Sequence, residues 1–125
     1  MPDYTARFAT FIEGLPAAPV VVGHSMGALI ALDLALRETK GLAALGALNA
    51  VFERSEEASK AVIARATALR DGNGADPSAP LDRWFGPAPA NALQPAAMAC
   101  HEWLTSVDPT GYARAYHVFA QSDKR

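Results

Sequence analysis

One stretch between residues 20 and 48 constrains the fold more than any other part of the chain. It opens with Val20-Val21-Val22, three β-branched residues without polar alternation, which is typical of a strand buried on both faces. The turn from Gly23 to Gly27 leads into a segment, Met26 to Glu38, that is apolar nearly all round and predicts a deeply buried helix. Leu42 to Leu48 is apolar without a break and predicts a second strand. Strand, helix and strand in this order form a right-handed crossover unit, so we expect two parallel strands and an α/β fold.

A helix is predicted before the first strand. One apolar stripe with helical spacing runs through the segment, formed by Tyr4, Phe8, Phe11, Ile12 and Leu15. Asp3 is the expected N-terminal cap of this helix, and Gly14 followed by Pro16 is expected to end it.

The second half of the chain has a different, helical character, with no strand pattern after Val51. Ser55 is expected to cap a helix whose first turn is acidic, which the helix dipole favours. Two further helices are predicted near residues 96–105 and 109–121. Asp108 is the expected cap of the last one, because proline follows it at the first helical position.

Length and charge narrow the classes of function. A chain of 125 residues fits one domain of ordinary size. Thirteen acidic and eleven basic residues give a net charge of −2 without a basic cluster, which argues against nucleic acid or an anionic membrane as partner. Cys100 is the single cysteine, so an internal disulfide is excluded and a reducing compartment fits. The start lacks a secretory signal and no apolar run approaches the roughly 20 residues that span a bilayer, so we expect a cytoplasmic protein.

The turn between the first strand and its helix carries a chemical motif. Gly23-His24-Ser25-Met26-Gly27 matches G-x-S-x-G, the nucleophile elbow, and lies between a predicted strand and a predicted helix as that motif requires. A sharp turn at this place strains Ser25 and exposes its hydroxyl, while the Met26 N–H can stabilise an oxyanion. Gly23 and Gly27 are expected because a β-carbon at either position would collide with its surroundings. The alternative is that Ser25 is an ordinary helix cap after a strand.

With these residues the chain resembles the α/β-hydrolase superfamily, and especially its small serine esterases and lactonases, including relatives of the enol-lactone hydrolases. The resemblance implies a partial α/β-hydrolase fold, with two parallel core strands and the elbow in residues 1–54 and a helical cap in residues 55–125. Trp103-Leu104, Asp108-Pro109 and Gly111-Tyr112 are similar to the end of such a cap. It further implies that Ser25 is the nucleophile and that the Met26 N–H is an oxyanion donor, with His24 as a packing residue.

The catalytic acid and histidine that the resemblance requires are not evident. In the family they follow the cap, and a second oxyanion donor precedes the first helix, so we expect the chain to be a middle segment of a hydrolase. Ser25, Asp82 and His101 have the required chain order, but nothing in their spacing supports an internal triad. His101 and His117 are otherwise expected as half-exposed residues of helices.

Aromatic residues in the second half allow two interpretations. Residues 75–95 are rich in proline and alanine and predict a loop with at most a short helical turn, anchored by Trp84-Phe85. These and other aromatic side chains either line an apolar substrate pocket or hold the cap helices together. The candidates for substrate binding are Trp84, Trp103, Tyr112 and Tyr116. Cys100 is expected as a small buried residue, because no base or sharp turn accompanies it.

Two functions are consistent with these observations. The first is a serine hydrolase acting on a small carboxylic ester or lactone through an acyl-enzyme at Ser25, without metal or organic cofactor, since no ligand cluster or phosphate loop is present. The second is a non-catalytic truncated product or a subunit. A sheet of only two strands leaves edges unpaired, so such a chain is expected to self-associate through them.

Overall fold

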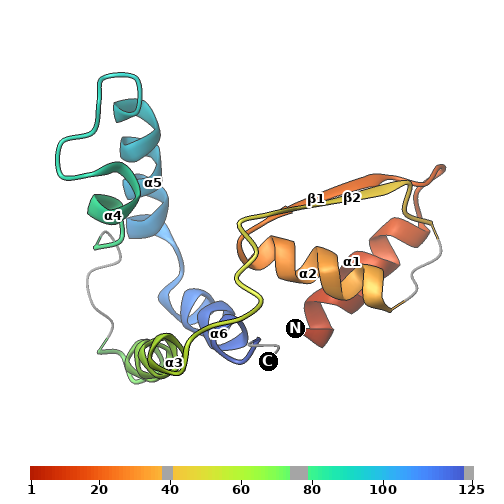
Figure 1. Cartoon of the computed structure of the whole chain (residues 1–125), viewed down its shortest axis with the longest axis horizontal. Coiled ribbons are helices and arrows are strands. Elements are labelled where there is room, and N and C mark those ends of the chain that lie inside the picture. Colours follow the sequence, from red (N-terminus) through yellow and green to blue (C-terminus); the bar gives the residue numbers. More distant parts are fainter. Residues whose placement is uncertain (38–40, 74–78, 123–125) are drawn as a thin grey trace. The chain divides into compact units, whose positions relative to one another are not determined.

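The computed structural model describes residues 1–37, 41–73 and 79–122 (Figure 1). These residues form two compact units, one made of residues 1–59 with the chain's end from residue 118, and one made of residues 60–117. The first unit contains α1 (Pro2–Glu13), β1 (Val20–His24), α2 (Met26–Leu36) and β2 (Ala44–Leu48). α3 (Glu56–Arg70) and α6 (Pro109–Ala120) have residues in both units, and α4 (Leu81–Phe85) and α5 (Gln94–Ser106) belong to the second.

The first unit has the predicted strand–helix–strand order. β1 and β2 are parallel, and their register pairs Val20 with Ala44 and His24 with Leu48. α2 connects them and packs against both strands, and α1 packs against α2. Both helices lie on the same side of the two strands (Figure 1). The predicted α/β fold, with two parallel strands and the elbow between a strand and a helix, is therefore confirmed.

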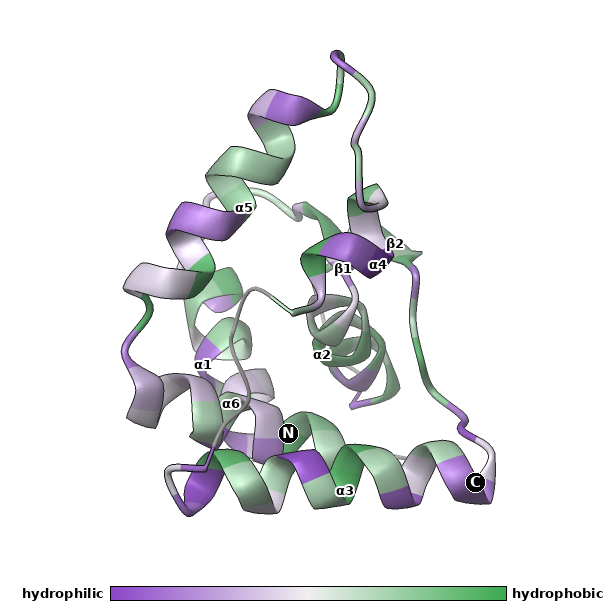
Figure 2. Ribbon diagram, turned by 90° about the vertical axis from the view of Figure 1, so that its left-hand side faces the viewer, coloured by the Kyte–Doolittle hydropathy of each residue, from purple (hydrophilic) through white to green (hydrophobic). Residues whose placement is uncertain are grey.

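The core of this unit lies between the helices and one face of the sheet. Its buried centre is formed by Ile12 of α1 with Ile30 and Leu34 of α2, and Val21 of β1 packs against it. α2 is hydrophobic over most of its surface (Figure 2), and five of its residues are buried: Ala28, Leu29, Ile30, Ala31 and Leu34. Leu36, near its end, is 79% exposed, so the helix is not buried all round, and its predicted last residue, Glu38, lies outside the described residues.

The prediction that the strands are buried on both faces is wrong. Val20 and Val22 are 64% and 63% exposed, and Leu48 is 54% exposed. These side chains lie on the face opposite Val21, because successive side chains of a strand alternate between the two faces. Among the described residues of this unit, helices cover only the face that carries Val21. Val21 is therefore partly buried, whereas Val20, Val22 and Leu48 on the opposite face are exposed.

The helix caps are partly as predicted. Ser55 and Asp108 act as caps: the Ser55 Oγ accepts the N–H of Ala58 at 3.2 Å, and the Asp108 Oδ2 accepts the N–H of Gly111 at 2.6 Å. The prediction for Asp3 is wrong. α1 begins at Pro2, so Met1 holds the cap position and Asp3 lies within the first turn. Proline fits that first position because it has no N–H to leave unpaired there.

The second unit is helical among its described residues. α5 and α6 start within two residues of the predicted positions. Residues 75–78 of the predicted loop lie outside the described residues, and the short α4 forms around Trp84 and Phe85 and packs against α5. α4 ends at Phe85 and is followed by the capping residue Gly86, whose φ of 79° is accessible to glycine at little cost. Among the described residues, no helix combines the length and apolar character needed to cross a membrane.

Candidate active site

Ser25 occupies the junction where β1 ends and α2 begins. Its backbone has φ 54° and ψ −118°, a positive-φ conformation that costs free energy for a residue with a β-carbon. The side chain lies at the carboxyl end of the strand and is exposed. In α/β folds this end of a parallel sheet is where ligands bind. The structure therefore holds a strained serine at the edge where chemistry would occur.

The backbone of Ser25 is fixed from both sides. Its N–H donates to the Leu48 carbonyl at 2.9 Å, which extends the β1–β2 ladder by one bond. Its carbonyl accepts the N–H groups of Ala28 and Leu29 at 3.0 and 3.3 Å, which begins α2. The hydroxyl makes no capping hydrogen bond to the helix. The interpretation of Ser25 as an ordinary capping serine therefore finds no support in its contacts.

Only one of the two glycine positions of the motif sterically requires glycine. A β-carbon at Gly23 would lie 2.1 Å from the Gly27 carbonyl oxygen and 2.4 Å from its carbon. Because both atoms belong to the backbone, no side-chain movement could relieve that overlap. A β-carbon at Gly27 would meet no described heavy atom within 4 Å. The expected collision at Gly27 is therefore wrong, and the close approach of the two segments involves Gly23 alone.

The start of α2 offers backbone donors beside Ser25. The N–H groups of Met26 and Gly27 belong to the first turn of the helix, where no carbonyl of the same helix can reach them. The partial positive charge of the helix N-terminus lies at the same place. This arrangement can stabilise an anion that forms next to the Ser25 hydroxyl.

His24 forms a side-chain hydrogen bond with Asn49, a residue outside the G-x-S-x-G motif. Its Nε2 lies 3.0 Å from the Nδ2 of Asn49, the residue directly after β2. Both side chains are exposed at the carboxyl end of the sheet. Asn49 also has a positive φ, 49°, a property that it shares with Ser25 and with no other described residue except glycines. The sequence signal was an asparagine after an apolar strand, since asparagine tolerates this conformation better than most residues.

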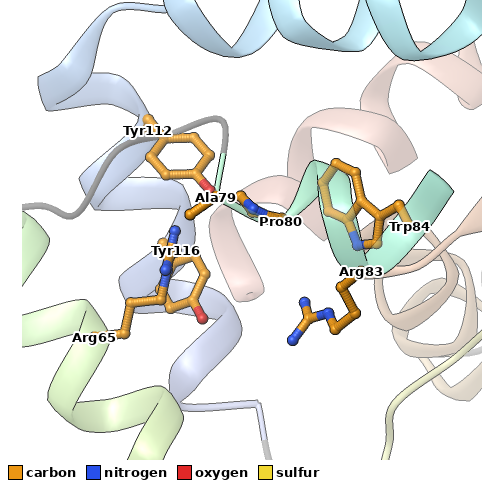
Figure 3. Close-up of a pocket in the computed structure, with 7 residues that line it drawn as sticks. All are labelled: Arg65, Ala79, Pro80, Arg83, Trp84, Tyr112 and Tyr116. Carbon is orange, nitrogen blue, oxygen red and sulfur yellow. The ribbon is translucent and has the colours of Figure 1, made fainter. Parts of the chain in front are cut away.

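The four aromatic residues considered for substrate binding line two cavities of the second unit. One cavity of about 220 Å³ is bounded by α3, α4 and α6, and its lining consists of Arg65, Ala79, Pro80, Arg83, Trp84, Tyr112 and Tyr116 (Figure 3). A neighbouring cavity of about 260 Å³ is lined by Trp84, Cys100, Trp103, Leu104, Val107 and Tyr112. Trp84 and Trp103 are 53% and 67% exposed, and both interpretations of these aromatic residues stay open. Cys100 is only partly buried, contrary to the expectation.

The first of these cavities combines positive charge with aromatic rings, and we call it the arginine–tyrosine pocket. Arg65 places its guanidinium 5.5 Å from the centre of the Tyr116 ring. The rings of Tyr112 and Tyr116 are tilted by 42°, with their centres 6.1 Å apart. Figure 3 shows Arg65 reaching Tyr116 from α3, and Arg83 and Trp84 extending from α4. The Nη2 of Arg65 is buried and has no hydrogen-bond partner among the described residues. Buried polar atoms normally have a hydrogen-bond partner, so this nitrogen is a candidate donor to an anionic oxygen.

The remaining candidates for a triad lie in the second unit. Asp82 is on α4, His101 on α5 and His117 on α6, and all three are exposed. Their relation to Ser25 is not determined, so the order Ser25, Asp82, His101 stays a hypothesis. No group of three or more His, Cys, Asp or Glu side chains that could hold a metal ion occurs among the described residues.

Comparison with known proteins agrees with this geometry. Residues 1–123 match the model of a family described as the alpha/beta hydrolase family. The chain is also similar to an (E)-2-((N-methylformamido)methylene)succinate hydrolase from Acinetobacter baylyi, with 38% identity over 113 residues. That match covers 90% of this chain and 42% of the relative, so the chain spans less than half of that protein's length. No solved structure gives a significant match.

Proposed function

Because the chain belongs to the alpha/beta hydrolase family, we propose that it provides the nucleophile of a serine hydrolase acting on a small carboxylic ester or lactone. The observation that carries this proposal is Ser25, an exposed serine with φ 54° between β1 and the start of α2. A strained backbone at a strand–helix turn is the geometry of the nucleophile elbow. The free hydroxyl and the neighbouring donors of α2 support the same role.

In the proposed reaction the Ser25 oxygen attacks the carbonyl carbon while its proton passes to a general base. The tetrahedral oxyanion is stabilised by the Met26 N–H. When it collapses, the bond to the leaving oxygen breaks, the base returns its proton to that oxygen to give the alcohol, and the acyl group stays on Ser25. Water then attacks this ester, releases the carboxylic acid and restores the hydroxyl. The general base and its acid partner are not assigned to residues of this chain. Residues outside it, or His101 or His117, would have to supply the base.

The arginine–tyrosine pocket of the second unit has a charge that suits an anionic ligand. Two guanidinium groups, one of which has a buried candidate donor nitrogen, favour a ligand with a carboxylate, and no acidic residue is among the described lining residues. The name of the relative from Acinetobacter baylyi describes a succinate, which is a dicarboxylate. We therefore extend the proposal to esters or lactones that also carry a free carboxylate.

A test of this function measures hydrolysis of two aryl esters, p-nitrophenyl acetate and the mono-p-nitrophenyl ester of succinate, by the protein and its variants. Ser25→Ala is expected to lower kcat/KM by about 10³-fold or more for both esters, because the nucleophile is lost. Ser106→Ala, at an exposed serine that ends α5, is the matched control and should retain activity. Arg83→Gln should raise KM for the succinate ester alone. Activity that survives Ser25→Ala would contradict the proposal.

The alternative function, a non-catalytic subunit, is favoured by one observation. Val20, Val22 and Leu48 are more than half exposed on a single face of the sheet. A folded protein that hydrolyses neither ester and forms stable oligomers would support this alternative over the hydrolase.

A further inference from the structure

Each of the two parallel strands is followed by a residue with a positive φ. His24 and Leu48 are register partners and the last residues of β1 and β2. The residues that follow them, Ser25 and Asn49, have φ values of 54° and 49°. The N–H of Ser25 donates to the carbonyl between them, that of Leu48, at 2.9 Å. Two residues with a positive φ therefore lie side by side at the edge from which the Ser25 hydroxyl is exposed.

A side-chain hydrogen bond joins these two ends. The Asn49 Nδ2 faces the His24 Nε2 at 3.0 Å, although the residues are 25 positions apart in sequence. With the amide nitrogen as donor, Nε2 is the acceptor, so the ring proton of neutral His24 lies on Nδ1. The bond thus selects one tautomer and one orientation of a ring whose residue precedes the serine.

The stability of the fold gives only a weak reason for the hydrogen bond between Asn49 and His24. The bond joins two exposed side chains, and hydrogen bonds of this kind contribute only about 0.5–1.5 kcal/mol. The positive φ of Asn49 costs free energy, and this cost offsets part of the stabilisation from the hydrogen bond. Strained residues that persist in folded proteins cluster at functional sites, where they set geometry.

We propose that Asn49 is a positioning residue, which holds the His24 ring in its Nδ1–H tautomer and thereby fixes the peptide that leads into Ser25. The role of this position in catalysis rests on the proposed function of Ser25. Asn49 itself does not take part in bond making or breaking. Its side-chain amide holds the ring of His24, and His24 in turn positions Ser25. The positive φ of Asn49 directs the amide toward the end of β1.

Substitutions at Asn49 can separate the side chain from the backbone. Glycine adopts a φ of 49° without steric cost and has no amide, so Asn49→Gly removes the side-chain hydrogen bond while this backbone conformation stays accessible. Asn49→Asp keeps a residue type that tolerates this conformation and presents only acceptors, so Nε2 must then carry a proton. Asn91→Gly, at another exposed asparagine in the second unit, is the matched control.

The experiment records long-range ¹H–¹⁵N spectra of the histidine rings in mildly alkaline buffer, where imidazole is neutral, together with the rate of fluorophosphonate labelling at Ser25. We expect the Nδ1–H pattern for His24 in the wild type and in Asn91→Gly. Asn49→Gly should give a tautomer mixture, and Asn49→Asp the Nε2–H pattern. Labelling should fall about three- to tenfold in Asn49→Gly while the thermal midpoint changes little.

The outcomes distinguish this inference from the proposed function. An unchanged His24 tautomer in Asn49→Gly would overturn the inference, whatever the labelling rate. A changed tautomer with an unchanged labelling rate would overturn the positioning of Ser25. A folded wild type that is not labelled at all would instead count against the proposed function, and the ring spectra would still decide whether Asn49 holds His24.

Discussion

Strain at Ser25 depends on the close approach of the strand end to the following helix. Gly23 lies where the backbone of Gly27 leaves no room for a β-carbon, and this contact brings the chain back on itself within four residues. The turn can be this tight only because position 23 is glycine. At residue scale the elbow is therefore a packing arrangement of backbone against backbone, with the serine side chain directed outward as its result.

This account predicts opposite results for the two motif glycines. Gly23→Ala should cost more than about 4 kcal/mol of the free energy of unfolding, or prevent folding, because backbone atoms must separate. Gly27→Ala should be neutral or add up to about 1 kcal/mol, since the residue lies in α2 and its β-carbon has free space. Urea denaturation followed by circular dichroism measures both. An equal decrease in the free energy of unfolding for the two variants would contradict the geometry described.

At the scale of elements, the end of α6 is held by a buried arginine from the segment after β2. Arg54 is 6% exposed, and its Nη2 and Nη1 donate to the carbonyls of Phe119 and Ala120 at 3.0 and 3.5 Å. Its guanidinium lies 4.2 Å from the centre of the Phe119 ring. The last carbonyls of a helix have no partners within the helix, and the helix dipole favours a cation there.

Removing this cation should weaken the first unit. Arg54→Met keeps most of the apolar stem and removes the donors, and we expect a loss of about 1–3 kcal/mol in the free energy of unfolding. Arg114→Met, at an exposed position of the same helix, is the control and should change stability by less than about 0.5 kcal/mol. Chemical denaturation compares the two. A similar effect of both variants would show that Arg54 does not cap α6.

The order of elements could be predicted from the sequence because apolar runs and local chemistry determine it. The strand, helix and strand of residues 20–48 and the caps Ser55 and Asp108 depend on neighbouring residues alone. Burial could not be predicted in the same way. The exposure of Val20 and Val22 depends on what covers the second face of the sheet, which the three-valine pattern does not contain.

The candidate site was predictable to a similar extent. The motif indicated Ser25 and Met26, because G-x-S-x-G requires only local geometry. The bond between His24 and Asn49 depends on the register of β1 and β2, and no spacing in the sequence reveals that register. Likewise Arg65 and Arg83, 18 positions apart, line one cavity because of how α3 and α4 are placed within their unit.

At the scale of the whole molecule, one face of the sheet carries exposed apolar side chains. This open sheet face consists of Val20, Val22, Ala44 and Leu48, which are all exposed. We propose that it binds a second copy of the chain, since exposed apolar surface on a sheet with unpaired edges favours association.

Sedimentation over a range of concentrations tests this proposal. Val20→Thr combined with Val22→Thr should shift the chain toward monomer, because both positions keep β-branched residues but become more polar. Val21→Thr, on the covered face, should lower stability without reducing association. A wild type that stays monomeric at high concentration would contradict the role of the open sheet face.

The central claim, that Ser25 is an activated nucleophile, is tested most directly by mass spectrometry. Trypsin releases the peptide from Phe8 to Arg37, in which Ser25 is the only serine, so fragmentation of a labelled peptide distinguishes a phosphonate on Ser25 from one on Thr10. The measurement treats the protein, expressed from its whole reading frame, with a fluorophosphonate before digestion. We predict a labelled peptide from the wild type and none from Ser25→Ala. An unmodified peptide from folded wild-type protein would contradict the claim.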